Sequence, residues 1–205
     1  MIAMDLKSVQ PGFNNEALDS QAVFRVALNA LSHPGRLWDM PLQSGLPKKG
    51  HAAAAVLMLG LLDSECTLWL SPSLAASDVP AWLRFHTGCQ LVRDINQAQF
   101  VWVGQGDQMP RLEHMNAGND AYPDQSATCV LEVSEMHQDV GGWSLEGPGI
   151  QERQALRVAG FAADFEAQWE QNHANFPRGV DLYLVSAGVI AGLPRTTRIQ
   201  TVQES

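Results

Sequence analysis

The sequence has few lysines, few cysteines and no long apolar run. Its basic residues are ten arginines and three lysines, Lys7, Lys48 and Lys49. The cysteines are odd in number and form no CxxC pair, which argues against a disulfide framework and favours a reducing compartment. The longest apolar run, residues 52–62, is shorter than the ~20 residues that a membrane-spanning helix needs.

The first residues, MIAMDLKSVQPGF, also lack the apolar core of a secretory signal, so we expect a cytoplasmic protein with no membrane partner. The net charge of -9 opposes binding to DNA or to an anionic membrane surface.

The common catalytic motifs are missing as well. The sequence contains no GxSxG elbow, no GxxxxGK[ST] loop and no HExxH helix. Residues 104–106 (GQG) lack the third glycine of a dinucleotide fingerprint and indicate a turn. Cys66 and Cys129 lie in apolar stretches and are interpreted as inert buried thiols. Cys89, near His86, lacks a visible orienting group, so we predict no catalytic residue.

One cluster, which consists of Glu132, Glu135, His137 and Asp139, has the residue types of a metal site. Glu135, His137 and Asp139 would share one face of an extended strand. The segment runs into Gly141 and Gly142, and polar residues are expected beside such a turn. We therefore interpret the cluster as a solvated strand edge, and we predict neither a metal nor a cofactor.

Length predicts one domain, with residues 1–15 as an N-terminal arm and residues 16–205 as a single α/β domain. Apolar spacing, caps and breakers predict helices at residues 19–33, 51–62, 77–88, 107–116 and 162–175. The 51–62 segment is apolar nearly all round, which predicts burial. Asp107 is the expected cap of the fourth helix.

Strands are expected at residues 36–40, 66–70, 98–103, 128–136, 143–147, 156–160, 180–185, 189–193 and 198–202. Residues 128–136 and 143–147 are expected to pair as a hairpin across Gly141 and Gly142. Residues 180–185 and 189–193 form a second hairpin, preceded by a type I turn at residues 176–179. Interleaved helices and hairpins predict a mixed β-sheet flanked by helices.

The arginines are the better functional candidates. If Pro194 starts a helical turn, Arg195 and Arg198 share one face near the hydroxyls of Thr196 and Thr197 and could hold a phosphate. If the segment is a strand, the two arginines point to opposite faces and form a charged edge, which is the simpler interpretation.

Four other residues belong to the same candidate set for anion binding or for an interface. Arg84 and His86 lie on one predicted helix, with His86 on its apolar face. Arg178 lies in a turn, where a solvated charge is expected. Asp181, at a strand start, either orders an arginine or caps the turn.

Six short segments in order resemble the PhnH family, whose members are subunits of the bacterial carbon–phosphorus lyase system. They are FR (24–25), SHPG (32–35), WLRFHT (82–87), GPGI (147–150), FPRGVD (176–181) and PRTT (194–197). Each is weak alone, but their order and spacing span residues 22–199.

The resemblance implies a fold like the large domain of pyridoxal-phosphate-dependent transferases. It also implies a homodimer or a complex with PhnG, PhnI, PhnJ and PhnK partners. The associated reaction, with PhnG, PhnI and PhnL, places an alkylphosphonate on the ribose C1 of a purine nucleoside triphosphate and displaces the base. The expected product is a ribose 1-phosphonate 5-triphosphate.

Pyridoxal chemistry needs a lysine for the internal aldimine, and no lysine follows Lys49. We therefore expect the fold without the cofactor. The main hypothesis is a structural or binding subunit that is not independently catalytic. The alternatives are a stand-alone enzyme that uses the arginines, and a sensor of a phosphorylated small molecule.

Overall fold

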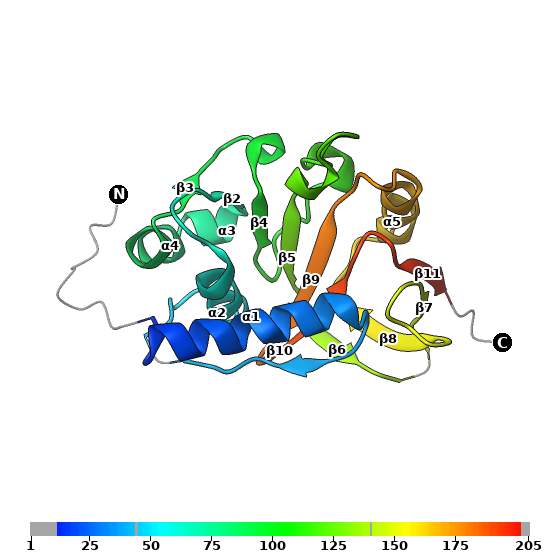
Figure 1. The fold of residues 1–205 in the computed structure, drawn as a ribbon, viewed down its shortest axis with the longest axis horizontal. Helices are drawn as coiled ribbons and strands as arrows, with labels where there is room; N and C mark the ends of the chain where they lie inside the picture. Colours follow the sequence, from blue (N-terminus) through cyan, green and yellow to red (C-terminus); the bar gives the residue numbers. More distant parts are fainter. Residues whose placement is uncertain (1–11, 44, 140, 202–205) are drawn as a thin grey trace.

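A computed structural model of the chain describes residues 12–43, 45–139 and 141–201. It is an α/β protein with a mixed sheet and flanking helices, as the sequence predicts (Figure 1). The helices are α1 (Glu16–Ser32), α2 (Ala52–Leu61), α3 (Pro72–Ala75), α4 (Val79–Thr87) and α5 (Phe165–Ala174), with 3-10 turns η2 (Ile95–Gln97), η3 (Leu112–His114) and η4 (Pro123–Gln125).

The large sheet has seven strands in the order β1-β10-β9-β5-β4-β2-β3. These are β1 (Trp38–Asp39), β10 (Val189–Leu193), β9 (Asp181–Ser186), β5 (Thr128–Glu132), β4 (Phe100–Val103), β2 (Thr67–Leu70) and β3 (Gln90–Leu91). The strands from β9 to β3 pair in parallel, whereas β10 and β1 pair antiparallel. A second sheet has the order β11-β7-β8-β6.

Alternation along the central strands gives the large sheet a core on each face. On β4, Trp102 packs into one core while Val101 and Val103 pack into the other. Residues on β5 and β9 alternate in the same way, as the twofold repeat of a strand requires. The central strands are therefore buried on both faces, which explains their nearly continuous apolar sequences.

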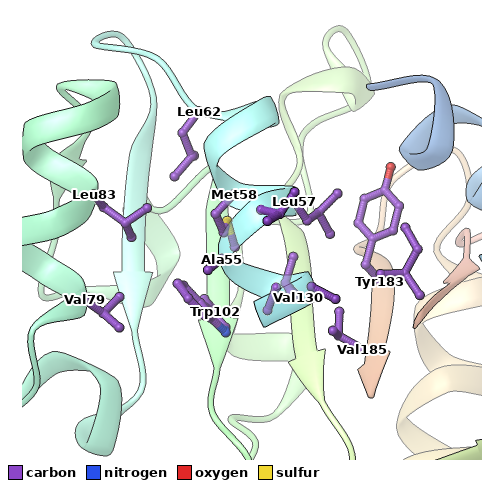
Figure 2. Packing of buried hydrophobic residues seen from close by; sticks show 14 of the residues in the cluster. Ala55, Leu57, Met58, Leu62, Val79, Leu83, Trp102, Val130, Tyr183 and Val185 are labelled. Atoms are coloured by element: carbon purple, nitrogen blue, oxygen red, sulfur yellow. The ribbon is translucent and has the colours of Figure 1, made fainter. Parts of the chain in front are cut away.

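The first core lies under α1, α2 and α4. Six consecutive residues of α2, from Ala53 to Met58, are buried, which confirms the predicted buried helix. Figure 2 shows Leu57 and Met58 above Trp102 and Val130 of the central strands. Gly88 ends α4 in the left-handed conformation, as predicted.

The first helix begins earlier than the apolar pattern indicates. Asn15 is its N-cap, and the Asn15 side chain accepts a hydrogen bond from Leu18 N at 3.1 Å. The sequence offers Asp19 or Ser20 as the cap, but Asp19 instead accepts from Asn15 N at 2.8 Å. The two side chains thus form a reciprocal cap that neither residue type signals alone.

The second core lies between the large sheet, the small sheet and α5. The small sheet contains β6 (Glu135–His137), β7 (Trp143–Glu146), β8 (Gln154–Ala159) and β11 (Arg198–Thr201). The hairpin predicted across Gly141 and Gly142 is wrong, because β6 and β7 each pair with β8 and not with each other. The chain leaves the large sheet after β5, so the predicted 128–136 strand is divided between two sheets.

Two other local predictions are wrong. Asp107 does not start a helix; its carboxylate accepts a hydrogen bond from Ser73 N, in the first turn of α3, at 2.9 Å. The turn after α5 lies one residue earlier than predicted, with Arg178 N donating to Asn175 O at 3.0 Å and a cis Phe176–Pro177 peptide bond. Residues 147–150 form a type II turn, with Gly149 at φ 84° in its third position and Ile150 N donating to Gly147 O at 3.1 Å.

The predicted hairpin of residues 180–193 is confirmed as β9 and β10. Helix α1 packs directly on this hairpin at Gly192, where a Cβ atom would overlap the carbonyl oxygen of Ala30. A glycine at this place allows the helix backbone to contact the strand. Gly188, in the hairpin turn, has only an ordinary contact at 3.7 Å from Leu42.

We expect Gly192→Ala to lower the free energy of unfolding by about 2–3 kcal/mol, because the obstructing atoms are backbone and cannot rotate away. Chemical denaturation measures this change, with Gly188→Ala as the matched control and an expected effect below about 0.5 kcal/mol. Equal effects of the two substitutions would contradict the close packing of α1 on β10.

Candidate functional site

Arg195 lies in the turn between β10 and β11 and forms an ion pair with Asp181. Thr197 N donates to Pro194 O at 2.8 Å and closes the turn. The Nε atom of Arg195 donates to both carboxylate oxygens of Asp181, at 3.1 and 3.2 Å, and Nη2 lies 2.5 Å from Asp181 Oδ2. The carboxylate also accepts from the Arg195 backbone N–H at 2.7 Å. Asp181 therefore orders an arginine rather than only capping a turn.

The remaining donors of Arg195 bind the loops around it. Nη1 donates to the carbonyl oxygens of Pro123, at 2.9 Å, and Pro177, at 3.2 Å. Nη2 also donates to Ser126 Oγ. The side chain is only 12% exposed, so these contacts are shielded from water. We call Arg195, Asp181, Ser126, Pro123 and Pro177 the Arg195 network. All guanidinium nitrogens of Arg195 have protein acceptors, so an anion would have to displace them.

Arg198 points to a different partner. Its Nε donates to Nε2 of His173 at 3.1 Å, and His173 Nδ1 lies 2.9 Å from Arg195 O. These two contacts fit the tautomer with the proton on Nδ1. Arg198 is exposed in an open groove of about 620 Å³ between α5 and β11. The structure thus separates Arg198 from Arg195, and the two guanidinium groups do not share one site.

The two threonines between these arginines differ in burial. Thr197 is fully buried, and its hydroxyl has no hydrogen-bond partner in the described part of the chain. Its carbonyl oxygen accepts from Trp169 Nε1 at 2.8 Å, which ties the turn to α5. Thr196 is half-buried.

The other candidate residues lie apart from one another. Arg178 is exposed and forms a surface ion pair with Asp120 at 3.3 Å. Arg84 and His86 lie on α4, which Figure 1 shows on the side of the molecule opposite α5. Arg84 is exposed, whereas the ring of His86 contacts Trp82 and Phe85. Burial lowers the pKa of His86, so its ring favours the neutral form.

The buried thiols are poor nucleophiles. Cys129 lies within the second core, and burial raises its pKa to about 12. Cys89 is 3% exposed, and burial likewise raises its pKa despite a hydrogen bond from Thr87. Both thiols therefore remain protonated near neutral pH.

The polar residues in and just after β6 are exposed to solvent along the edge of the small sheet. Glu135 and His137 are exposed, with His137 Nε2 3.4 Å from Glu135 Oε2. Asp139 instead pairs with Arg157 through two contacts at 2.9 and 2.8 Å. Within residues 12–43, 45–139 and 141–201, no group of three His, Cys, Asp or Glu side chains is arranged to hold a metal ion.

The carboxyl ends of parallel strands commonly bind ligands in open α/β sheets. Here that edge carries the buried carboxylate of Glu132, which is the last residue of β5 and is 5% exposed. Its oxygens accept from His51 N at 2.6 Å, from Trp102 Nε1 at 3.0 Å and from Gln105 N at 3.0 Å. His51 is the N-cap of α2. An internal carboxylate thus occupies the helix end where an external anion would otherwise be favoured.

A second carboxylate occupies the adjacent position, between β2 and β4. Asp107 accepts from Ser71 Oγ at 2.5 Å and from Ser73 N at 2.9 Å. Burial raises the pKa of Asp107, but these hydrogen bonds and the charge of Lys49 outweigh it, and the pKa is lowered overall. Glu132 and Asp107 place two carboxylates at this edge of the sheet, which disfavours the binding of a phosphate group.

Three of the short sequence segments meet around glycines. A Cβ atom on Gly149 would overlap Ser32 O, and one on Gly147 would lie 2.8 Å from Thr196 O. The GPGI segment therefore lies between the SHPG and PRTT segments. The FPRGVD segment joins the same region through Asp181 and Pro177 of the Arg195 network. WLRFHT, on α4, lies apart from it.

Comparisons with known proteins confirm the family resemblance that these segments carry. Residues 11–200 match the family model described as "Bacterial phosphonate metabolism protein (PhnH)". The chain belongs to the PhnH family. It is 32% identical to a Rhizobium meliloti protein named "Alpha-D-ribose 1-methylphosphonate 5-triphosphate synthase subunit PhnH", over 92% of this chain and 94% of that protein.

A second relative is the Stutzerimonas stutzeri protein named "Putative C-P lyase subunit protein HtxG". It is 34% identical over 90% of this chain and 87% of its own length. Across the described residues, no helix is both long enough and apolar enough to cross a bilayer.

We expect Arg195→Ala to lower the free energy of unfolding by about 3 kcal/mol, because it leaves the largely buried Asp181 carboxylate without its partner. Arg178→Ala, which removes an exposed ion pair, is the control and should cost less than about 1 kcal/mol. Urea denaturation of both variants measures the difference. A stability of Arg195→Ala equal to that of Arg178→Ala would show that the network does not stabilise the fold.

Proposed function

We propose that this chain is a structural and binding subunit of a carbon–phosphorus lyase assembly in alkylphosphonate catabolism. Within that assembly it contributes to the transfer of a phosphonate onto the ribose of a purine nucleoside triphosphate. Its partners are subunits of the PhnG, PhnI, PhnJ and PhnK types. The observation that carries this proposal is the family match over residues 11–200, with relatives named as subunits.

A supporting role, rather than independent catalysis, accounts for the chemistry of the candidate residues. Arg195 and Asp181 hold loops together, and burial keeps Cys89 and Cys129 protonated. The carboxyl edge of the sheet is occupied by Glu132 and Asp107. These groups stabilise the fold through internal contacts, so the reacting groups of the transfer belong to partner subunits.

The exposed side of α1 is the surface that we assign to a partner subunit. Leu18, Phe24 and Leu28 are 65%, 48% and 51% exposed, while Val23 and Ala27 on the other side of the helix are buried. We call the three exposed side chains the α1 apolar face. Phe24 belongs to the FR segment that the family resemblance includes, yet it does not fill the core. Exposed apolar side chains on one helix face are typical of protein–protein contacts.

Alone, the chain is expected to form a homodimer, and we place it in the cytoplasm. Measuring the mass of the lone chain by light scattering distinguishes a dimer from a monomer.

Phe24→Glu and Leu28→Glu should each abolish co-purification with the partner subunits, because each places a charge on an apolar contact surface. The measurement is the mass and composition of the complex eluted from a tagged copy expressed with phosphonate-operon subunits. The protein alone should keep its unfolding midpoint, since both side chains are exposed.

The matched control is Phe85→Glu, which changes a phenylalanine of similar exposure, 53%, on α4. It should leave the complex intact. A wild-type chain that elutes without partners would contradict the subunit proposal. Complexes formed equally well by all variants would contradict only the assignment of the partner-binding surface to the α1 apolar face.

The same proposal predicts no stable adduct with pyridoxal phosphate. Lys48 and Lys49 are exposed, and the nearby carboxyl edge of the sheet carries Glu132 and Asp107, which repel a phosphate. After incubation and gel filtration, the protein should show no aldimine absorbance. A retained absorbing adduct that disappears in Lys48→Arg/Lys49→Arg would contradict this prediction.

A further inference from the structure

A polar hollow of about 370 Å³ lies where the SHPG and GPGI segments meet. It is lined by Pro34, Arg36, Gly149, Ile150, Gln151, Glu152, Arg153 and Gln154. We call it the arginine hollow. None of its arginines was singled out by sequence motifs, because they come from segments more than one hundred residues apart. Only the contact between the two loops brings them to one place.

The Arg36 side of the hollow rests on a fixed backbone. Arg36 N donates to His33 O at 3.2 Å, and Gly35 N donates to Gly192 O of β10 at 3.0 Å. A Cβ atom on Gly35 would lie 2.5 Å from Leu145 of β7. The turn that carries Arg36 is thus held between the two sheets, so the position of its backbone is set before any ligand binds.

The opposite side is fixed by the GPGI turn. Ile150 N donates to Gly147 O at 3.1 Å, and the Gly149 backbone packs against Ser32 O and the ring of Pro34. The backbone N–H groups of Gln151, Glu152 and Arg153, which follow this turn, have no acceptor in the described part of the chain. Consecutive backbone donors of this kind are available to an anion.

Arg36 has an unpaired guanidinium available for a ligand, and the exposed Arg153 lies in the same lining. Arg36 is exposed and has no ion pair among the described residues. Arg153 is exposed and forms an ion pair with Glu146, with 2.9 Å between Arg153 Nε and Glu146 Oε1. This surface ion pair restrains the Arg153 side chain beside the hollow. Arg195, in contrast, uses every guanidinium nitrogen within the fold.

The lining residues carry two arginines and one carboxylate, Glu152, although the whole protein has a net charge of -9. Glu146, outside the lining, neutralises part of this positive charge through its ion pair with Arg153. The lining is mainly polar, so the hollow suits a compact, strongly hydrated group rather than an apolar body. Arginine forks match the oxygen spacing of phosphate and phosphonate groups.

We propose that the arginine hollow binds a tetrahedral phosphorus oxyanion through Arg36 and Arg153. This inference rests on the proposed function, in which both substrates carry such a group: the alkylphosphonate and the triphosphate of the nucleotide. The subunit would then hold the charged end of a substrate beside the PRTT turn, which contacts Gly147 on the other side of the GPGI segment.

Titration calorimetry of the full chain at low salt tests the proposal with three probes: methylphosphonate, inorganic phosphate and ATP. We expect binding that weakens as salt is added, because the contacts are charged and exposed. Arg36→Ala/Arg153→Ala should weaken the binding about tenfold or more, since it removes two charge-assisted donors. Preference for methylphosphonate identifies the phosphonate as ligand, and preference for ATP identifies the nucleotide phosphates.

The control is Arg25→Ala/Arg157→Ala. Arg25 matches Arg36 as an exposed arginine that has no ion pair with any described residue. Arg157 matches Arg153 as an exposed arginine paired with a carboxylate. This control should bind the probes like the wild type. No binding of any probe at 10 mM (about ten times a 1 mM Kd), or equal binding by both double variants, would overturn the proposal.

Co-purification of the Arg36→Ala/Arg153→Ala chain separates this inference from the proposed function. The variant should still assemble with the partner subunits, because the hollow and the α1 apolar face share no residue. Normal assembly together with unchanged probe binding would reject oxyanion binding in the arginine hollow and leave the proposed function intact. Failure of the wild-type chain to assemble would reject the proposed function.

Discussion

The ion pair between Arg195 and Asp181 is the constraint on which the end of the molecule around β11 depends. It joins the start of β9 to the turn after β10, and the same guanidinium binds loops at Pro123, Ser126 and Pro177. The residues of this network are distant in sequence, and most of its bonds are shielded from water. Loss of the arginine would leave a carboxylate and several carbonyl groups without donors at once, so these loops are expected to loosen together.

This constraint changes how the short family segments are understood. In PRTT and FPRGVD, Arg195 and Asp181 hold the fold, and in SHPG and GPGI the glycines allow loops to approach closely. Two features have no such internal role: the α1 apolar face and the exposed, unpaired guanidinium of Arg36 in the arginine hollow. We assign the first to a partner subunit and the second to a substrate oxyanion. Together they describe a subunit that joins an assembly and contributes charge to a shared site.

Local sequence signals predicted the α/β class, the buried helix α2, the end of α4 at Gly88 and the β9–β10 hairpin, because each depends on nearby residues. These local signals failed where contacts between distant residues determine the structure. Asp107 looks like a cap for the residues that follow it but binds the first turn of α3, some thirty residues earlier. Residues 128–136 look like one strand but divide between two sheets, which local apolar spacing does not encode. Likewise, Arg36 and Arg153 share a hollow only because Gly149 packs on Ser32.

The most direct test of the subunit account is hydrogen–deuterium exchange of the wild-type chain, alone and within a purified assembly of its partner subunits. The account predicts that assembly slows amide exchange in α1 around Phe24 and Leu28, while exchange in the buried strands β4 and β5 stays as it is in the lone chain. Slower exchange confined to other surfaces would contradict the assignment of α1. An absence of any change on mixing, with no complex formed, would contradict the claim that this protein acts as a subunit.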